Sequence, residues 1–111
     1  EGVTIFGSGG QTRDYVYVGD VARAHKIALE EQEPVTVNIG SGAGTSVNQL
    51  FNLMATETEY PLLPEHGEPR PGDVEHVVLD VSRARRELGW SSRTTLEDGL
   101  RQTLASIALF A

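Results

Sequence analysis

The chain has 111 residues, of which 39% are hydrophobic, and its nine basic and sixteen acidic side chains give a net charge of −7. This length suits one small domain, and the acidic field disfavours nucleic acid and anionic membranes because no basic patch offsets it. The absence of cysteine excludes disulfides and thiolate chemistry and points to a reducing compartment, for which the cytoplasm is the default.

The first forty residues combine short strand patterns with one helical pattern. Strands are predicted over 3–7 and 13–18, on either side of the glycine-rich loop GSGG. Asp20 is expected to cap a helix that stops before Pro34. A third β-branched run, 35–40, predicts another strand.

A second helix is predicted directly after Ser46. Gln49 stands at the third helical position, as in a capping box, and apolar residues recur with a period near 3.6. The proline-rich connection over 60–73 is expected to be a loop, since each proline lacks a backbone donor.

The last third of the chain predicts one strand and two helices. The strand covers 76–80, Ser82 is expected to cap the next helix and Gly89 to end it, and Thr95 with Asp98 caps the final helix. This order predicts the α/β class with an α+β-like character, in one domain over residues 1–111. The ββα start argues against a complete doubly wound sheet.

Targeting signals are absent from the pattern. No apolar run approaches the length of a membrane span, and the start EGVTIFGSGG has neither the basic nor the apolar part of a signal peptide. Because a strand pattern begins almost at once and no methionine precedes it, we expect Glu1 to be a cut end.

Neither glycine-rich loop carries the dinucleotide fingerprint, because Thr12 and Thr45 stand where its third glycine would be. We interpret these glycines as turn residues, since glycine reaches positive φ without steric cost. A Tyr-xxx-Lys pair is impossible, because the only lysine is Lys26 and Ala22 stands four residues before it. With no serine in a nucleophile elbow and three scattered histidines, we predict no catalytic, cofactor-binding or metal-binding residue.

Two arginines stand on backbone that is conformationally restricted. Arg13 follows a glycine loop, and Arg70 lies in the proline-framed stretch GEPRPGD, three residues before Asp73. A planar guanidinium held in this way suits bidentate phosphate binding, and Asp73 could accept a hydrogen bond from a ribose hydroxyl. The alternative is a set of local ion pairs, of Arg13 with Asp14 or Asp20 and of Arg70 with Asp73 or a glutamate.

Four ordered blocks carry a family resemblance: IFGSGGQTRDYVYVGDVARAHKIAL, VNIGSGAGTSVNQL, PRPGDVEHVVLDVSRARRELGW and TTLEDGLRQTL. Together they resemble the C-terminal third of extended short-chain dehydrogenases/reductases (SDRs) of the NAD-dependent epimerase/dehydratase family, most closely the UDP-glucose 4-epimerase group. The resemblance implies the substrate domain of an extended Rossmann-type enzyme, without the half that carries the glycine fingerprint.

The resemblance also implies a role for five residues. Thr4 and Phe6 are similar to the residues that line the uracil. Arg13 and Arg70 resemble the pair that grips the nucleotide diphosphate, and Asp73 resembles the acceptor of the ribose hydroxyl. The implied ligand is therefore a UDP-sugar or a related nucleotide sugar.

The family's Ser/Thr and Tyr-xxx-Lys are missing from this chain, so it is not expected to catalyse a reaction alone. The resemblance implies that NAD in the intact enzyme takes a hydride from C4 of the hexose and returns it to the other face, and that this chain binds no NAD itself. Two hypotheses stay open. One is the nucleotide-sugar-binding part of an epimerase, dehydratase or decarboxylase, whose missing N-terminal half is a partner; the other is a non-catalytic binding or self-association module, since bare apolar faces favour homo-oligomers.

Overall fold

The computed structural model describes residues 2–109. The chain divides into two compact units. The first unit combines the N-terminal segment through Arg13 with Gly44–Val77, and the second combines Asp14–Ala43 with the chain from Val78 onward. Over the described residues there are four helices and four short strands, so the predicted mixed α/β class is confirmed.

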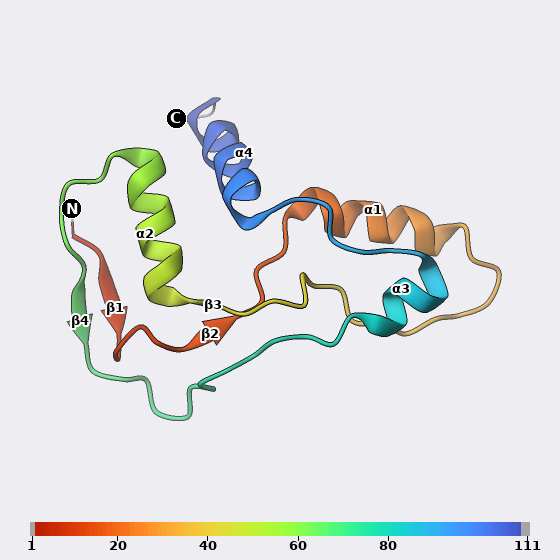
Figure 1. Cartoon of the computed structure of the whole chain (residues 1–111), viewed down its shortest axis with the longest axis horizontal. Helices are drawn as coiled ribbons and strands as arrows, with labels where there is room; N and C mark the ends of the chain where they lie inside the picture. The colour runs from red at the N-terminus through yellow and green to blue at the C-terminus, as the bar shows by residue number, and fades with distance from the viewer. Residues whose placement is uncertain (1, 110–111) are drawn as a thin grey trace. The chain divides into compact units, whose positions relative to one another are not determined.

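The first unit contains two strand pairs and one helix (Figure 1). Strand β1 (Thr4–Phe6) lies parallel to β4 (Glu65–Gly67), and β2 (Thr12–Arg13) lies antiparallel to β3 (Thr45–Ser46). Helix α2 (Val47–Thr58) follows β3 directly. The strand predicted over 3–7 is thereby confirmed.

The capping box predicted for α2 is confirmed. The Ser46 side chain accepts a hydrogen bond from the backbone N–H of Gln49 at 3.1 Å, and the Gln49 side chain accepts one from the backbone N–H of Ser46 at 2.8 Å. The helix ends at Glu59, whose φ of 56° is left-handed. These caps fix both ends of the helix that stands beside β1.

Strand β4 lies inside the stretch predicted to be a loop, so that prediction is wrong for Glu65–Gly67. The sequence around it has no β-branched alternation to indicate a strand. Backbone pairing with β1 holds Glu65–Gly67 in a strand conformation. Ile5 at the middle of β1 is only 4% exposed. A tertiary partner here outweighs local propensity.

The second unit is built on three helices, α1 (Val18–Leu29), α3 (Ser82–Leu88) and α4 (Leu96–Leu109). Its buried core consists of three residues from different segments, namely Ala24, Ala84 and Trp90. The Trp90 indole N–H donates to the backbone carbonyl of Asp20 at 2.9 Å, which satisfies the one polar atom of this fully buried ring.

The helix ends of the second unit match the sequence in two places and differ in two, at the starts of α3 and α1. Thr95 accepts from the backbone N–H of Asp98 at 3.2 Å, and Gly89 has the left-handed φ of 63° expected after a helix. Ser82, however, is the first residue of α3 and not its cap, so that prediction is wrong. The Asp80 carboxylate accepts the N–H of Ser82 at 3.0 Å, and this bond lowers the pKa of Asp80.

Helix α1 begins at Val18, and its N-cap is Tyr17. The prediction that Asp20 caps this helix is therefore wrong, because Asp20 lies inside it. Its side chain is buried and accepts hydrogen bonds from the backbone N–H groups of Arg93 and Thr94, at 3.1 and 3.0 Å. Burial raises the pKa of Asp20, but these hydrogen bonds outweigh it and the net pKa is lowered.

The strand predicted over 13–18 is wrong beyond Arg13, where β2 ends. After Arg13, hydrogen bonds to a side chain replace strand pairing. The Asp14 carboxylate accepts from the backbone N–H groups of Ser41, Gly42 and Leu79 at 2.7, 2.9 and 3.2 Å. Burial raises the pKa of Asp14, yet these bonds and one from the Ser41 hydroxyl lower it overall. A side chain therefore organises this segment.

The strands predicted over 35–40 and 76–80 are also absent from the described chain. Val37 and Ile39 do pack on the core while Asn38 is exposed, as in a strand, but no neighbouring backbone forms a ladder with them. The second run forms only one bridge, between Thr12 and His76. The β-branched pattern was real in both cases, but a strand also requires a backbone partner.

Candidate functional site

The first unit contains a cavity of about 370 Å³ between β1 and α2. The strand contributes Thr4 and Phe6, whose side chains are exposed, while the helix contributes an apolar wall. The rest of the lining comes from Val3 and Ile5, from the segment after the first glycine loop and from the proline-framed loop. The wall consists of Val47, Leu50, Phe51 and Met54, and the loops add Gln11, Arg70 and Asp73.

A second cavity of about 310 Å³ adjoins the proline-framed loop. Its lining is more polar and includes Ser8 from the glycine loop and Glu75. Four side chains line both cavities, so they stand where the two meet: Phe6, Gln11, Arg70 and Asp73.

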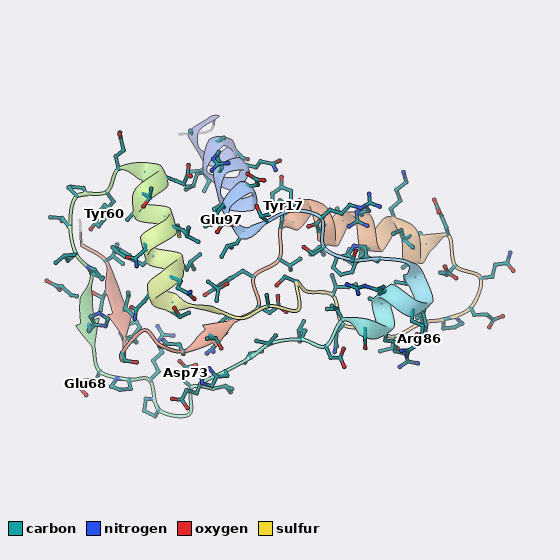
Figure 2. The ribbon with its side chains drawn as sticks, in the orientation of Figure 1. Tyr17, Tyr60, Glu68, Asp73, Arg86 and Glu97 are labelled. Atoms are coloured by element: carbon teal, nitrogen blue, oxygen red, sulfur yellow. The ribbon has the colours of Figure 1, made fainter. Side chains whose placement is uncertain are left out.

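Asp73, which lines both cavities, forms an ion pair with Arg13. One guanidinium nitrogen of Arg13 donates to Asp73 Oδ1 at 2.8 Å and the other to the backbone carbonyl of Thr12 at 2.7 Å. Both side chains stay partly exposed, at 28% and 40%. In Figure 2, Asp73 lies on the bend of the chain beyond β4. The pair therefore holds a cation and an anion in place while leaving both open to a ligand.

The loop that carries Arg70 and Asp73 is a tight turn. The backbone N–H of Asp73 donates to the carbonyl of Arg70 at 3.2 Å, and Gly72 has a φ of 77°, which other residues seldom adopt. Arg70 in turn stacks on the Phe6 ring, with its guanidinium carbon 4.4 Å from the ring centroid. The turn thus brings a second cation to the site.

All five residues predicted from the sequence lie in the first unit: Thr4, Phe6, Arg13, Arg70 and Asp73. The alternative of local ion pairs is wrong for Arg13, whose partner is the distant Asp73 and not Asp14 or Asp20. For Arg70 the partner found is an aromatic ring. The binding roles of these residues stay predictions.

Two features of the site were missed. Gln11 lines both cavities, and its side-chain amide donates to the carbonyl of Phe6 at 3.1 Å. The apolar stripe of α2 was predicted as a helix pattern but was given no role in the site, and it lines the first cavity. A polar residue between a glycine loop and a strand was the only signal for Gln11.

One edge of β1 is turned away from β4. The backbone carbonyl of Val3 accepts from the N–H of Glu65 at 2.9 Å, and the backbone N–H of Gly7 donates to the carbonyl of Gly67 at 3.0 Å. In a parallel ladder only every second residue of a strand bonds to a given neighbour. The N–H and C=O groups of Thr4 and Phe6 therefore point to the other edge. On that edge, the side chain of Gln11 occupies the carbonyl of Phe6.

The start of α2 does not offer the free N–H groups with which a glycine-fingerprint loop holds the pyrophosphate of a dinucleotide. The only glycine-rich approach to a helix leads into α2, and its first N–H groups are occupied: Val47 donates to Gln11, Asn48 to Gly9, and Gln49 to Ser46. An anion would find no free donors there. Within residues 2–109, no three histidine, aspartate or glutamate side chains gather as a metal site, and no helix is both long and apolar enough to cross a bilayer.

Known proteins share both sequence and fold with this chain. The family model of GDP-mannose 4,6 dehydratase matches residues 1–103. UDP-glucose 4-epimerase of Mycolicibacterium smegmatis is 38% identical over 101 residues, which are 90% of this chain and 32% of that protein.

Two solved structures superpose closely. UDP-glucose 4-epimerase of Thermotoga maritima, in complex with UDP-glucose, is 44% identical with a TM-score of 0.94, over 99% of this chain and 36% of that one. MoeE5 in complex with UDP-glucuronic acid and NAD is 33% identical with a TM-score of 0.91, over 100% of this chain and 38% of that one. The chain thus spans about a third of the length of its relatives. It belongs to the GDP-mannose 4,6 dehydratase family, within the NAD-dependent epimerase/dehydratase SDRs.

Proposed function

We propose that this chain is the nucleotide-sugar-binding portion of an NAD-dependent sugar-nucleotide 4-epimerase and is not catalytic alone. One observation carries the proposal: Arg70 and Asp73 line an apolar cavity in the first unit, and Arg13 forms an ion pair with Asp73. Two cations and one anion beside an apolar cavity of about 370 Å³ suit a ligand that joins a flat base to a diphosphate through a ribose.

The diphosphate would lie between Arg13 and Arg70. Both guanidinium groups are at least partly exposed, and each can bind two phosphate oxygens in its plane. Asp73 would accept from a ribose hydroxyl, with the turn at Gly72 fixing its distance from Arg70. These roles agree with those that the family resemblance implies.

The free edge of β1 would read the base. Phe6 presents an N–H donor and a C=O acceptor side by side, and the carbonyl can accept a second hydrogen bond besides that from Gln11. This order matches an oxo group beside a ring N–H, as in uracil, thymine and guanine. Cytosine presents the reverse order, so a cytidine nucleotide would leave both groups unpaired. Of these bases, uracil is the one we propose for this chain.

The reaction itself would need residues from outside this chain. NAD supplies a hydride acceptor when it is bound in such enzymes, and the first N–H groups of α2 are already occupied within this chain. We therefore assign NAD and the Tyr-xxx-Lys to the N-terminal half of an intact enzyme. The unpaired backbone of 35–40 would give that half an edge to pair with. A cytoplasmic location also stays a prediction.

Calorimetric titration of UDP into the folded chain tests the proposal. We expect UDP to bind, CDP to bind far more weakly, and Arg70→Ala to weaken UDP binding by about 1.5–3 kcal/mol, the range for a charge-assisted contact. Arg83→Ala is the matched control, because it removes an exposed arginine of the second unit that pairs only with Glu87 on its own helix. A folded chain that shows no binding of UDP would contradict the proposal.

A second candidate function is self-association, and the exposed apolar side chain of Ile107 on α4 favours it. Ile107 is 59% exposed on the same side of the helix as Leu100 and Leu104. Light scattering during size-exclusion chromatography separates the two: a monomer that binds UDP supports the first proposal, and an oligomer that does not bind UDP supports the second. The product that the intact enzyme forms would distinguish an epimerase from a dehydratase or a decarboxylase.

A further inference from the structure

We infer that Arg70 makes the site selective for phosphorylated nucleotides, by covering the Phe6 ring until an anion draws it away. This inference rests on the proposed function and concerns the same site. In the free chain, the guanidinium of Arg70 lies 4.4 Å from the centroid of the ring. A flat base that stacks on this face must first displace it.

The position of this stack explains why displacement matters. Phe6 and Arg70 line both cavities, the apolar one against α2 and the more polar one beside the glycine loop. The stacked pair therefore stands at the boundary between them. A nucleoside diphosphate with its base in the apolar cavity and its diphosphate in the more polar one would cross this boundary, so Arg70 would have to leave the ring.

Phe6 is the aromatic ring that Arg70 covers and so keeps from stacking with a base. The other ring of the apolar cavity, Phe51, has an edge-to-face partner in Tyr60, with centroids 6.0 Å apart. Phe6 is 43% exposed, and its cationic partner is held by a weak and reversible contact. An aromatic base could take its place and keep the ring covered.

The exchange costs a different amount for different ligands. A bare nucleoside gains the Phe6 ring but gives the displaced guanidinium nothing in return. A nucleoside diphosphate offers that guanidinium an anion, which it binds more strongly than an aromatic face. The same side chain therefore opposes one ligand and favours the other. Arg13 has no such double effect, because its partner is the carboxylate of Asp73.

The decisive experiment compares uridine with UDP on the wild-type chain and on Arg70→Ala, by ligand-observed NMR and calorimetry at one ionic strength. We expect Arg70→Ala to bind uridine about threefold to tenfold more tightly, the range that a lost cation–π contact allows, and to bind UDP at least tenfold more weakly. Opposite signs for the two ligands are the signature. Arg83→Ala should change neither affinity.

A double mutant keeps the test independent of general damage. In a Phe6→Leu background the ring is gone, so Arg70→Ala should no longer improve uridine binding. Thermal unfolding followed by circular dichroism verifies that each variant is folded. Uridine binding that is unchanged, weaker, or undetectable in Arg70→Ala overturns the inference while UDP binding by the wild type still supports the proposed function. If the folded wild type binds neither ligand, the proposed function itself fails.

Discussion

The two units of this chain use their aspartate carboxylates in opposite ways. In the second unit, Asp14 and Asp20 accept from two or more backbone N–H groups each, so their charges are consumed within the fold. In the first unit, Asp73 has only the side chain of Arg13, and both stay open to solvent. A carboxylate bonded to backbone shapes a fold, whereas one bonded to an exposed side chain can exchange its partner for a ligand.

Arg23 and Arg70 differ in the same way in whether a ligand can replace their aromatic partner. Each lies over an aromatic ring, Arg23 over Trp90 at 5.6 Å and Arg70 over Phe6 at 4.4 Å. Trp90 is fully buried, so Arg23 can only cap it. Phe6 is exposed, so its cation can be replaced. The value of an arginine as a binding group therefore depends on whether its present partner is accessible.

The largest effect is expected from Asp20→Ala. Removing this buried carboxylate leaves the N–H groups of Arg93 and Thr94 without their acceptor and Arg23 without its ion-pair partner, which should lower the free energy of unfolding by about 3 kcal/mol. Urea unfolding followed by the fluorescence of Trp90, the chain's one tryptophan, measures the change in the second unit.

The same variant also tests how separate the roles of the units are. At a temperature where Asp20→Ala is still folded, its affinity for UDP should equal that of the wild type, because the candidate site lies in the first unit. A loss below about 1 kcal/mol, or a fall in UDP affinity as large as that of Arg70→Ala, would show that the comparison is wrong.

An intermediate effect is expected from glycine replacement in the first unit. Gly9 and Gly72 have nearly equal left-handed φ values, 79° and 77°. A Cβ on Gly9 would collide with the side chain of Asn48, whereas one on Gly72 would meet nothing within 4 Å. Gly72→Ala should therefore cost about 1 kcal/mol, the penalty for a left-handed residue, and Gly9→Ala about 2–3 kcal/mol.

Denaturant unfolding followed by far-UV circular dichroism compares these two variants. Asn48 donates to the carbonyl of Ser8 at 3.0 Å, so its displacement would also loosen the start of α2. Equal losses for Gly9→Ala and Gly72→Ala would mean that the side chain of Asn48 moves aside at no cost.

The sequence was sufficient where the signals were local. The capping box of α2, the cap at Thr95 and the turn at Gly89 depend on residues at most a few positions apart, and all three are confirmed. Asp20 was misassigned because an aspartate before a helical pattern resembles a cap, while its real partners are 73 and 74 residues away. No short-range pattern contains that information.

The candidate site shows the same division. Arg13 and Arg70 were selected because Arg13 follows a glycine-rich turn and Arg70 lies between two prolines, which are local features of the sequence. The ion pair between Arg13 and Asp73 joins residues 60 positions apart, and only the fold reveals it. Gln11 was missed because its role comes from reaching back to Phe6 across the glycine loop.

The smallest effect is the pH dependence of stability. Burial raises the pKa values of Asp14 and Asp20, but hydrogen bonds lower both below the ordinary value of 3.8. The unfolded chain therefore binds protons first as the pH falls, so their stabilisation is complete above about pH 4–5 and is lost as the pH drops through the folded-state pKa values. The urea midpoint should be flat from about pH 7 to 5 and fall steadily toward pH 3.

Asp14→Asn sharpens this prediction because it retains an acceptor oxygen but removes the charge. The variant should be less stable than the wild type near pH 6 and should approach it near pH 3, where the wild-type carboxylate is also becoming neutral. Asp98→Asn is the matched control, since Asp98 is an exposed residue of α4. If both variants gave the same slope as the wild type, the bonds from Ser41, Gly42 and Leu79 would stabilise the fold through geometry and not through the charge of Asp14.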